Sequence, residues 1–265
     1  MKMLLKFLGK VAGIVLVLVA ALVIFAMLTL KPNLPEQTLA LQSAEVTGTN
    51  QVLVFGASGK LGLEVVSDLV ARGDKVTAFV RSSSDRSQLE ALEADFAVGD
   101  VMEAETVEAA FTTGDFDAVI TAISGMGTAN LDYLGNAHIF DAAKKAGVGR
   151  VIFVSSVGAG DSYESAPLIS RLALRKVLPL KTQAEDHLRL SGLDYTILRP
   201  GGLPPGFVET GRGILSEDAT TMGFIKRPDL ARIIIGVLDD DQTIGKTLAV
   251  VDPGLERPWA GADPE

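Results

Sequence analysis

The sequence predicts an α/β protein built on a doubly wound parallel sheet and preceded by one transmembrane helix. Three observations lead to this prediction. Short apolar runs alternate with helical patterns from residue 51 onward, the first run leads directly into regularly spaced glycines, and residues 11–30 contain no charge. Apolar runs without polar alternation are typical of parallel strands that helices cover on both faces. With right-handed crossovers between the strands, they predict a Rossmann sheet.

Residues 11–30 are predicted to be a single membrane anchor. At about 1.5 Å per residue, a helix of this length spans about 30 Å, which matches the hydrocarbon core of a bilayer. The stretch is long for the apolar part of a signal peptide, usually about 7–15 residues, and too apolar for a surface helix. A cleaved signal peptide and a buried core helix are the alternatives to a retained span.

Composition divides the rest of the 265-residue chain into a proline-containing tether at residues 31–50, a domain at residues 51–252 and a tail at residues 253–265. The residues up to Lys31 hold four lysines and no acid, so the remaining 20 basic and 33 acidic residues leave a formal charge of −13. Such a surface repels nucleic acid, and it leaves the apolar helix as the link to a membrane. The absence of cysteine excludes disulfides and thiol chemistry.

Within the domain, apolar runs and helical periodicity predict alternating strands and helices. The strands are expected at Gln51–Phe55, Lys75–Val80, Asp95–Val98, Ala118–Ala122, Arg150–Val154, Tyr195–Leu198 and Thr247–Val251. The helices are expected at Lys60–Arg72, Arg86–Glu93, Ala104–Phe111, Leu131–Ala146, Leu168–Leu190 and Pro228–Leu238. Gly73 and Gly147 directly follow two of these helices and suit left-handed C-terminal caps, and Pro228 suits a first helical turn.

The first strand, glycine turn and helix follow one another in the order that binds a dinucleotide pyrophosphate. Gly56 permits the tight turn, Gly59 lets the backbone approach the phosphates, and Gly62 lets the helix pack close to the sheet. The helix N-terminus offers unpaired N–H groups and a partial positive charge to the anion. An ordinary αβ turn is the alternative for the glycines alone, but the flanking elements favour nucleotide binding.

The end of the second strand favours NADP (NADPH) over NAD. NAD sites usually place an acid there to bond the ribose 2′-hydroxyl, whereas this strand ends in Arg81, followed by three serines. An arginine with hydroxyl donors can neutralise a 2′-phosphate; a solvated loop arginine is the alternative. Asp100 after the third strand could meet the adenine, and the small residues around Ser124 after the fourth would let the cofactor approach. Each of these two loops could equally be a plain turn.

The lysines around the predicted span give conflicting indications of its orientation. The basic flank at residues 1–10 contains Lys2, Lys6 and Lys10, whereas Lys31 alone closely follows the span. The positive-inside rule therefore places the flank in the cytoplasm and the domain outside. A nicotinamide cofactor is, however, a cytosolic metabolite. On that ground we expect the domain on the cytoplasmic side of the membrane.

These motifs resemble those of the atypical short-chain dehydrogenase/reductases, over about Gln51 to Asp252. The similar segments are GASGKLG at the glycine turn, VR at the end of the second strand, VGD after the third, VIFVSSVGAG on the fifth, and KTQAEDHLRLSGLDYTILRPGGL. The part SGLDYTILRPGGL is the most specific. The most similar group is the NAD(P)H-binding branch with flavin/biliverdin reductase-like and NmrA-like proteins.

The resemblance implies roles for individual residues. Those that would hold the pyrophosphate are Gly56, Ser58, Gly59, Lys60, Leu61 and Gly62. Arg81 would lie at the 2′-phosphate and Asp100 near the adenine. Ser155 would lie near the nicotinamide with Ser156, and Pro200 and the glycines after it would close over the nicotinamide end. Lys181 falls where the lysine of the Y-x-x-x-K pair usually lies; a solvated helix lysine is the alternative.

The tyrosine of that pair is missing, because Val177 stands four residues before Lys181. That tyrosine protonates the alkoxide when a carbonyl accepts hydride, so ordinary ketone reduction is not expected. A flavin or quinone can take its proton from solvent. We therefore expect an NADPH-dependent reductase of a small, flat aromatic acceptor, with Lys181 and Ser155 as catalytic residues.

The alternative from another functional class is a non-catalytic NADPH sensor or assembly factor that binds a protein partner. The missing tyrosine favours this alternative, whereas the lysine and serine favour the reductase. His138 and His187 are scattered without ligand spacing, so no metal site is expected.

Overall fold

The computed structural model describes residues 32–41, 50–125, 130–206 and 208–256. The predicted anchor at residues 11–30, its basic flank and most of the predicted tail lie outside these residues. Within the described ranges, no helix combines the length and apolar character needed to cross a membrane.

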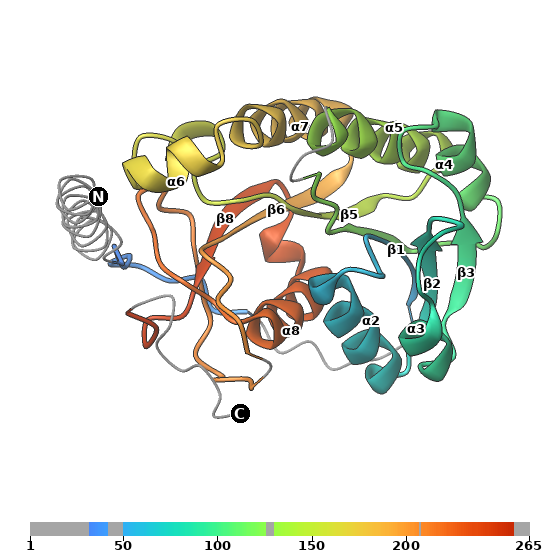
Figure 1. Ribbon diagram of the computed structural model, residues 1–265, viewed down its shortest axis with the longest axis horizontal. Helices are drawn as coiled ribbons and strands as arrows, with labels where there is room; N and C mark the ends of the chain where they lie inside the picture. The colour runs from blue at the N-terminus through green and yellow to red at the C-terminus, as the bar shows by residue number, and fades with distance from the viewer. Residues whose placement is uncertain (1–31, 42–49, 126–129, 207, 257–265) are drawn as a thin grey trace, which may run out of the picture.

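An eight-stranded sheet with the order β3-β2-β1-β4-β5-β6-β8-β7 forms the centre of the molecule (Figure 1). Neighbouring strands are parallel, except that β7 runs antiparallel to β8 at the edge. The strands are β1 (Gln51–Phe55), β2 (Lys75–Val80), β3 (Asp95–Val98), β4 (Ala118–Thr121), β5 (Arg150–Val154), β6 (Asp194–Pro200), β7 (Ile214–Ser216) and β8 (Lys246–Val251). The strand order reverses between β1 and β4, and ligands of open α/β sheets bind at the carboxyl ends of strands at such a point.

Helices cover both faces of the sheet (Figure 1). One face carries α2 (Lys60–Arg72), α3 (Ser87–Ala91) and α8 (Arg227–Leu238), and the other carries α4 (Ala104–Ala110), α5 (Asn136–Ala146) and α7 (Leu178–Ser191). Successive residues of β1 point to opposite faces, so Val52 and Val54 join the core on the α2 side while Leu53 and Phe55 join the core on the α4 side. The predicted Rossmann architecture is confirmed.

Most predicted elements agree with the structure, and the differences have local causes. Gly73 and Gly147 cap α2 and α5 with φ values of 99° and 79°, as expected. The helix expected at Leu168–Leu190 is instead two helices, α6 (Leu168–Ala173) and α7. Pro179 lies in the first turn of α7, where its missing N–H costs nothing, and it cannot continue a helix from before.

The sequence did not predict the short and irregular elements. The helix expected at Leu131–Ala146 begins with a π-helical turn, η1 (Leu131–Gly135), before α5. The strand β7 was not predicted, because three residues carry too little pattern. Two 3₁₀ turns complete the described elements: η2 (Gly160–Ser162) and η3 (Asp241–Thr243).

Part of the predicted tether packs against the domain. Asn33 and Met222 exchange two backbone hydrogen bonds of 2.8 Å, and the Leu39 N–H donates to the Leu215 carbonyl at 2.8 Å. Leu39 and Leu41 pack against the core on the α2 side. Residues 32–41 (blue in Figure 1) therefore run along the β7 edge of the sheet. Hydrogen bonds between the chain and the domain already begin at Asn33, before the predicted start of the domain at Gln51.

Candidate functional site

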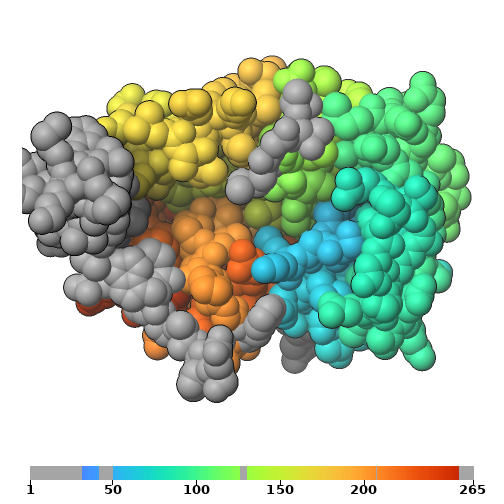
Figure 2. All heavy atoms as spheres, in the orientation of Figure 1, coloured from blue at the N-terminus to red at the C-terminus, as the bar shows by residue number. Residues whose placement is uncertain are grey.

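A cleft of about 1000 Å³ opens at the carboxyl ends of the central strands. In Figure 2 it corresponds to the recess between the yellow segments around α6 and the orange segments after β6. The residues predicted to bind cofactor or to act in catalysis all line this cleft: Gly56, Ser58, Gly59, Lys60, Leu61, Gly62, Arg81, Asp100, Ser124, Ser155, Lys181 and Pro200. Residues spread over more than half of the chain therefore meet at one site.

The glycine turn between β1 and α2 has the geometry that a pyrophosphate requires. Gly56 adopts a φ of +84°, and a Cβ there would lie 2.9 Å from the carbonyl carbon of Ala122. A Cβ on Gly62 would lie 2.1 Å from the Gly56 oxygen, so only glycine allows α2 to pack this closely. No acid stands in the first turn of α2. Its unpaired N–H groups therefore face the cleft without a competing negative charge.

An arginine stands at the end of the cleft where the adenine is expected. Arg81 is exposed where β2 ends, and no carboxylate among the described residues forms an ion pair with it. Ser84 lies beside Arg81 in the lining, and its N–H donates to the Arg81 carbonyl at 3.0 Å. This free guanidinium suits a 2′-phosphate.

Asp100 follows β3, the neighbour of β2, and also lines the cleft; its carboxylate is partly engaged by its own turn. One of its carboxylate oxygens accepts from the Met102 N–H at 2.9 Å, and its backbone N–H donates to the Thr106 hydroxyl at 3.0 Å. The second carboxylate oxygen remains for a ligand. The turn thus fixes the carboxylate at the rim, beside the place expected for the adenine.

Lys181 reaches the floor of the cleft, but its ammonium group is held by the protein. Nζ donates to the carbonyls of Ile123 at 2.9 Å and Val154 at 3.1 Å, and it lies 3.4 Å from a carboxylate oxygen of Asp132. Burial lowers the pKa of Lys181, and the neighbouring Asp132 charge partly offsets that effect. The side chain therefore ties together the ends of β4 and β5, and it is not the solvated lysine that was the alternative.

Asp132 belongs to a buried polar cluster that sequence reasoning missed. Its second carboxylate oxygen accepts from the Gly125 N–H at 3.0 Å. Its carbonyl accepts from Asn136 Nδ2 at 2.8 Å, and Asn136 Oδ1 accepts from the Thr121 hydroxyl at 2.8 Å. These contacts fix η1 against the loop after β4, and the cofactor is expected to pass along that loop.

Ser155 is anchored by a second cluster that was also missed. Its hydroxyl donates to Glu185 on α7 at 2.6 Å. The fully buried Glu185 carboxylate also accepts from Arg199 on β6 at 2.9 and 2.6 Å, and from Arg189 at 3.0 Å. Burial alone lowers the pKa of Arg199, but its bonds to Glu185 and Asp161 raise that pKa above the ordinary value, so Arg199 stays charged.

One sequence signal could have identified the second cluster. Arg199 interrupts an otherwise apolar strand, and arginine is almost never buried without a partner. Its partner Glu185 lies on the preceding helix, and only the fold reveals which acid is close enough.

No phenol lines the described part of the cleft. Tyr163 is exposed and lies against the Arg171 guanidinium, while Tyr133 and Tyr195 pack with the core on the α4 side. The cleft position four residues before Lys181 is occupied by Val177. Neither histidine lines the cleft: His138 bonds to the carbonyl of Val101 and His187 to the carboxylate of Asp141. The usual proton donor for ketone reduction is thus absent from the described walls.

Comparison with known proteins agrees with this geometry. A family model described as NAD(P)H-binding matches residues 56–241. The chain belongs to this family. It is an atypical short-chain dehydrogenase/reductase of the flavin/biliverdin reductase-like kind, as the sequence motifs implied.

Three similar proteins illustrate the range of the family. The structure of the anaerobillin reductase ChuY from Escherichia coli O157:H7 has 31% identity and a TM-score of 0.72, covering 78% of this chain and 99% of that one. The uncharacterized sugar epimerase YhfK of Bacillus subtilis is 34% identical over 73% of this chain and 90% of its own. The photosystem II assembly factor Ycf39 of Synechocystis is 27% identical over 80% of this chain and 65% of its own.

Proposed function

We propose that this protein is a membrane-anchored, NADPH-dependent reductase of a flat, flavin- or quinone-like acceptor. The observation that carries the proposal is one cleft with two different ends. The glycine turn and Arg81 line one end, and the other end is apolar and has no tyrosine in its described walls. Bound NADPH would supply a hydride to the acceptor.

The cofactor would lie along the carboxyl edge of the sheet. The glycine turn and the α2 N-terminus would hold its pyrophosphate, Arg81 its 2′-phosphate, and Asp100 its adenine. Lys181 would act as a positioning residue, because its donors hold the strand ends that form the floor beneath the nicotinamide. The Ser155 hydroxyl donates to Glu185, so it would offer the cleft a hydrogen-bond acceptor.

The acceptor end of the cleft favours a flat apolar molecule over a simple ketone. Its walls include Pro167, Leu174, Val177, Met222 and Phe224. A ketone needs a proton donor as hydride arrives, whereas the proton of a reduced flavin or quinone can come from water. The anaerobillin reductase named among the similar structures supports a reductase role.

We further propose that residues 11–30 anchor the protein in a membrane and that the domain lies on the cytoplasmic side. The uncharged length of the segment supports the anchor. The cytosolic supply of the nicotinamide cofactor supports the cytoplasmic side. The three lysines of the N-terminal flank favour the opposite side for the domain.

A second candidate function is an NADPH sensor or assembly factor that turns nothing over. The occupied donors of Lys181 and Ser155 favour it, because neither group is free to protonate a substrate. The relationship to an assembly factor agrees with this candidate.

Nucleotide binding is tested by titrating the protein with NADPH and comparing two glycine variants. A Cβ on Gly59 would lie 3.2 Å from the Gly56 oxygen, a tight contact that a small shift of the turn must relieve, and a valine there adds bulk where the pyrophosphate is expected. Gly149 is exposed and lies before β5, at the opposite edge of the sheet, and a Cβ there meets nothing closer than 3.9 Å. We expect Gly59→Val to lose NADPH binding and Gly149→Val to keep it. Equal affinity in the two variants would show that the nucleotide binds elsewhere.

A further inference from the structure

We infer that the acceptor end of the cleft faces the membrane surface, so that the acceptor enters from the bilayer. This inference rests on the proposed anchor and reductase function and names the acceptor class: a lipophilic molecule that partitions into the membrane. Three features of the described residues lead to it.

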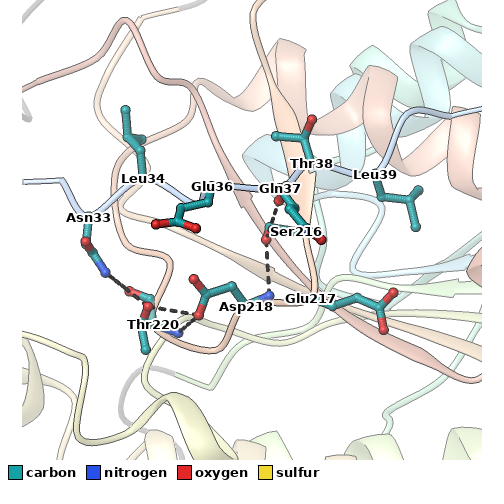
Figure 3. A pocket seen from close by; sticks show the side chains of 10 residues that line it. All are labelled: Asn33, Leu34, Glu36, Gln37, Thr38, Leu39, Ser216, Glu217, Asp218 and Thr220. Carbon is teal, nitrogen blue, oxygen red and sulfur yellow. Dashed lines mark hydrogen bonds between the residues drawn. The ribbon is translucent and has the colours of Figure 1, made fainter.

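The first feature is the short distance between the predicted anchor and the domain. Asn33 is already fixed, because its side-chain amide donates to the Thr220 carbonyl at 2.8 Å and to the Thr220 hydroxyl at 3.1 Å (Figure 3). Its backbone bonds with Met222 add to this attachment. Only two residues lie between the end of the span at Leu30 and Asn33, and the three Cα–Cα steps from Leu30 to Asn33 reach at most about 11 Å. The headgroup layer of one leaflet is about 5–8 Å thick, so Asn33 must lie at the membrane surface.

The second feature is that this attachment point forms part of the cleft wall. Met222, Gly223 and Phe224 line the acceptor end. A Cβ placed on Gly223 would lie 3.7 Å from Pro32 Cβ, so the chain leaving the predicted anchor lies directly behind that wall. The wall cannot swing far from the membrane, because its own backbone holds the anchored segment.

The third feature is the surface of α6 on the other wall of the same cleft. Pro167, Ser170 and Leu174 line the cleft, while Leu168 and Leu172, one turn apart, are 50% and 57% exposed. No residue of α6 is buried. Figure 1 shows α6 and the blue segment 32–41 at the same end of the long axis, away from β2 and β3. The apolar outer face of α6 therefore lies at the end where the anchor enters.

Charge on this end of the molecule is mixed. The exposed Arg175 and Lys176 follow α6, which is typical of a segment at a lipid interface, whereas Glu36 and Asp218 lie beside the attachment point. These acids line a separate polar hollow of about 670 Å³ that contains none of the predicted site residues (Figure 3). We therefore expect contact with the bilayer to depend on the two leucines more than on anionic lipid.

The orientation is tested with fluorescent labels, because the chain has no cysteine of its own. Single Leu168→Cys, Leu172→Cys and Leu190→Cys variants of the full chain carry an environment-sensitive dye and are reconstituted into phosphatidylcholine vesicles that contain a lipid-linked quencher. Leu190 is the matched control, since it is 86% exposed at the end of α7 that precedes β6, at the edge of the sheet opposite the cleft. We expect quenching at 168 and 172 to exceed that at 190 by about threefold or more. Equal quenching at the three positions, or failure of the full chain to enter vesicles, would overturn the inference.

The acceptor class is tested with two quinones. A Leu168→Glu/Leu172→Glu variant should oxidise NADPH with a long-tailed quinone dissolved in the vesicles about fivefold more slowly, equivalent to about 1 kcal/mol. A short-tailed, water-soluble quinone should be reduced at an unchanged rate, because neither leucine lines the cleft. Equal losses with both quinones, or no loss with either, would contradict entry from the bilayer. If neither quinone is reduced by the parent protein, the quinone proposal fails, while the quenching experiment still decides the orientation.

Discussion

The Ser155 hydroxyl has one proton, and Glu185 accepts it at 2.6 Å. Because Glu185 is fully buried and paired with Arg199, it remains the fixed acceptor of that proton. Ser155 can then only accept a hydrogen bond from a molecule in the cleft, such as an amide or ring N–H. At the scale of single residues, Ser155 on the described floor of the cleft is therefore expected to position a ligand rather than to deliver a proton to it.

We propose that Arg81 selects NADPH over NADH. We expect Arg81→Ala to weaken NADPH binding by about tenfold or more, because a charge-assisted contact contributes about 1.5–3 kcal/mol. NADH affinity should barely change, since NADH lacks the 2′-phosphate. Titration of each cofactor measures both effects, and similar losses for the two would contradict the assignment.

Lys181 is expected to affect stability as well as the site. Lys181→Met keeps an unbranched side chain but leaves the buried Asp132 carboxylate without a cation at 3.4 Å. Removal of one partner from a buried ion pair typically costs about 3–5 kcal/mol, which urea unfolding would report. The double variant Lys181→Met/Asp132→Asn removes both charges and should recover part of the loss. A single variant as stable as the parent protein would argue against this structural role.

Among the elements, the loop before β7 is held by two carboxylates: Asp229 on α8 accepts from the Thr210 and Gly211 N–H groups, and Asp252 lies just after β8. Asp252 accepts from the Thr210 hydroxyl at 2.7 Å, from Arg212 at 3.1 and 3.2 Å, and from the Gly254 N–H at 2.7 Å. Burial alone raises the pKa of Asp252, but these hydrogen bonds outweigh it and hold the pKa below its ordinary value. The loop is therefore held best when Asp252 is ionised.

This depressed pKa predicts a pH dependence of stability. An aspartate with a lowered pKa in the folded state contributes stability above its unfolded-state pKa of about 3.9, and that contribution is lost as the pH falls through the folded-state value. We expect Asp252→Asn to be about 1–3 kcal/mol less stable near neutral pH. Below about pH 4 its free energy of unfolding should fall less steeply than that of the parent protein, as measured by urea titration at several pH values. Parallel pH profiles would contradict the assignment.

Elements with a strong local pattern were predictable, and elements that depend on distant contacts were not. Apolar runs and glycines predicted the first and last residues of β1, β2, β3 and α2, and the structure confirms them. The break between α6 and α7 could have been read from Pro179. The strand β7 and the segment at Asn33 gain their structure from partners nearly 40 and 190 residues away, which no local pattern reveals.

Over the whole molecule, the site was predictable because a parallel sheet brings the ends of its strands to one edge. All twelve predicted site residues consequently line one cleft. The supporting clusters of Asp132 and Glu185 could not be predicted, because each joins helices and strands that meet only after folding. Sequence patterns thus identified residues that line one cleft, and the structure added the residues that hold them in place.

The measurement that tests the proposed reductase most directly is NADPH oxidation by the purified full chain, with flavins, quinones and simple ketones as alternative acceptors. We expect oxidation with a flavin or quinone and little or none with ketones, because a positioned general acid contributes about 10²–10⁴-fold and the described cleft walls provide no phenol. Rapid ketone reduction would contradict the proposed chemistry and direct attention to Tyr163. Tight NADPH binding without oxidation by any acceptor would contradict the reductase itself and favour the sensor or assembly factor.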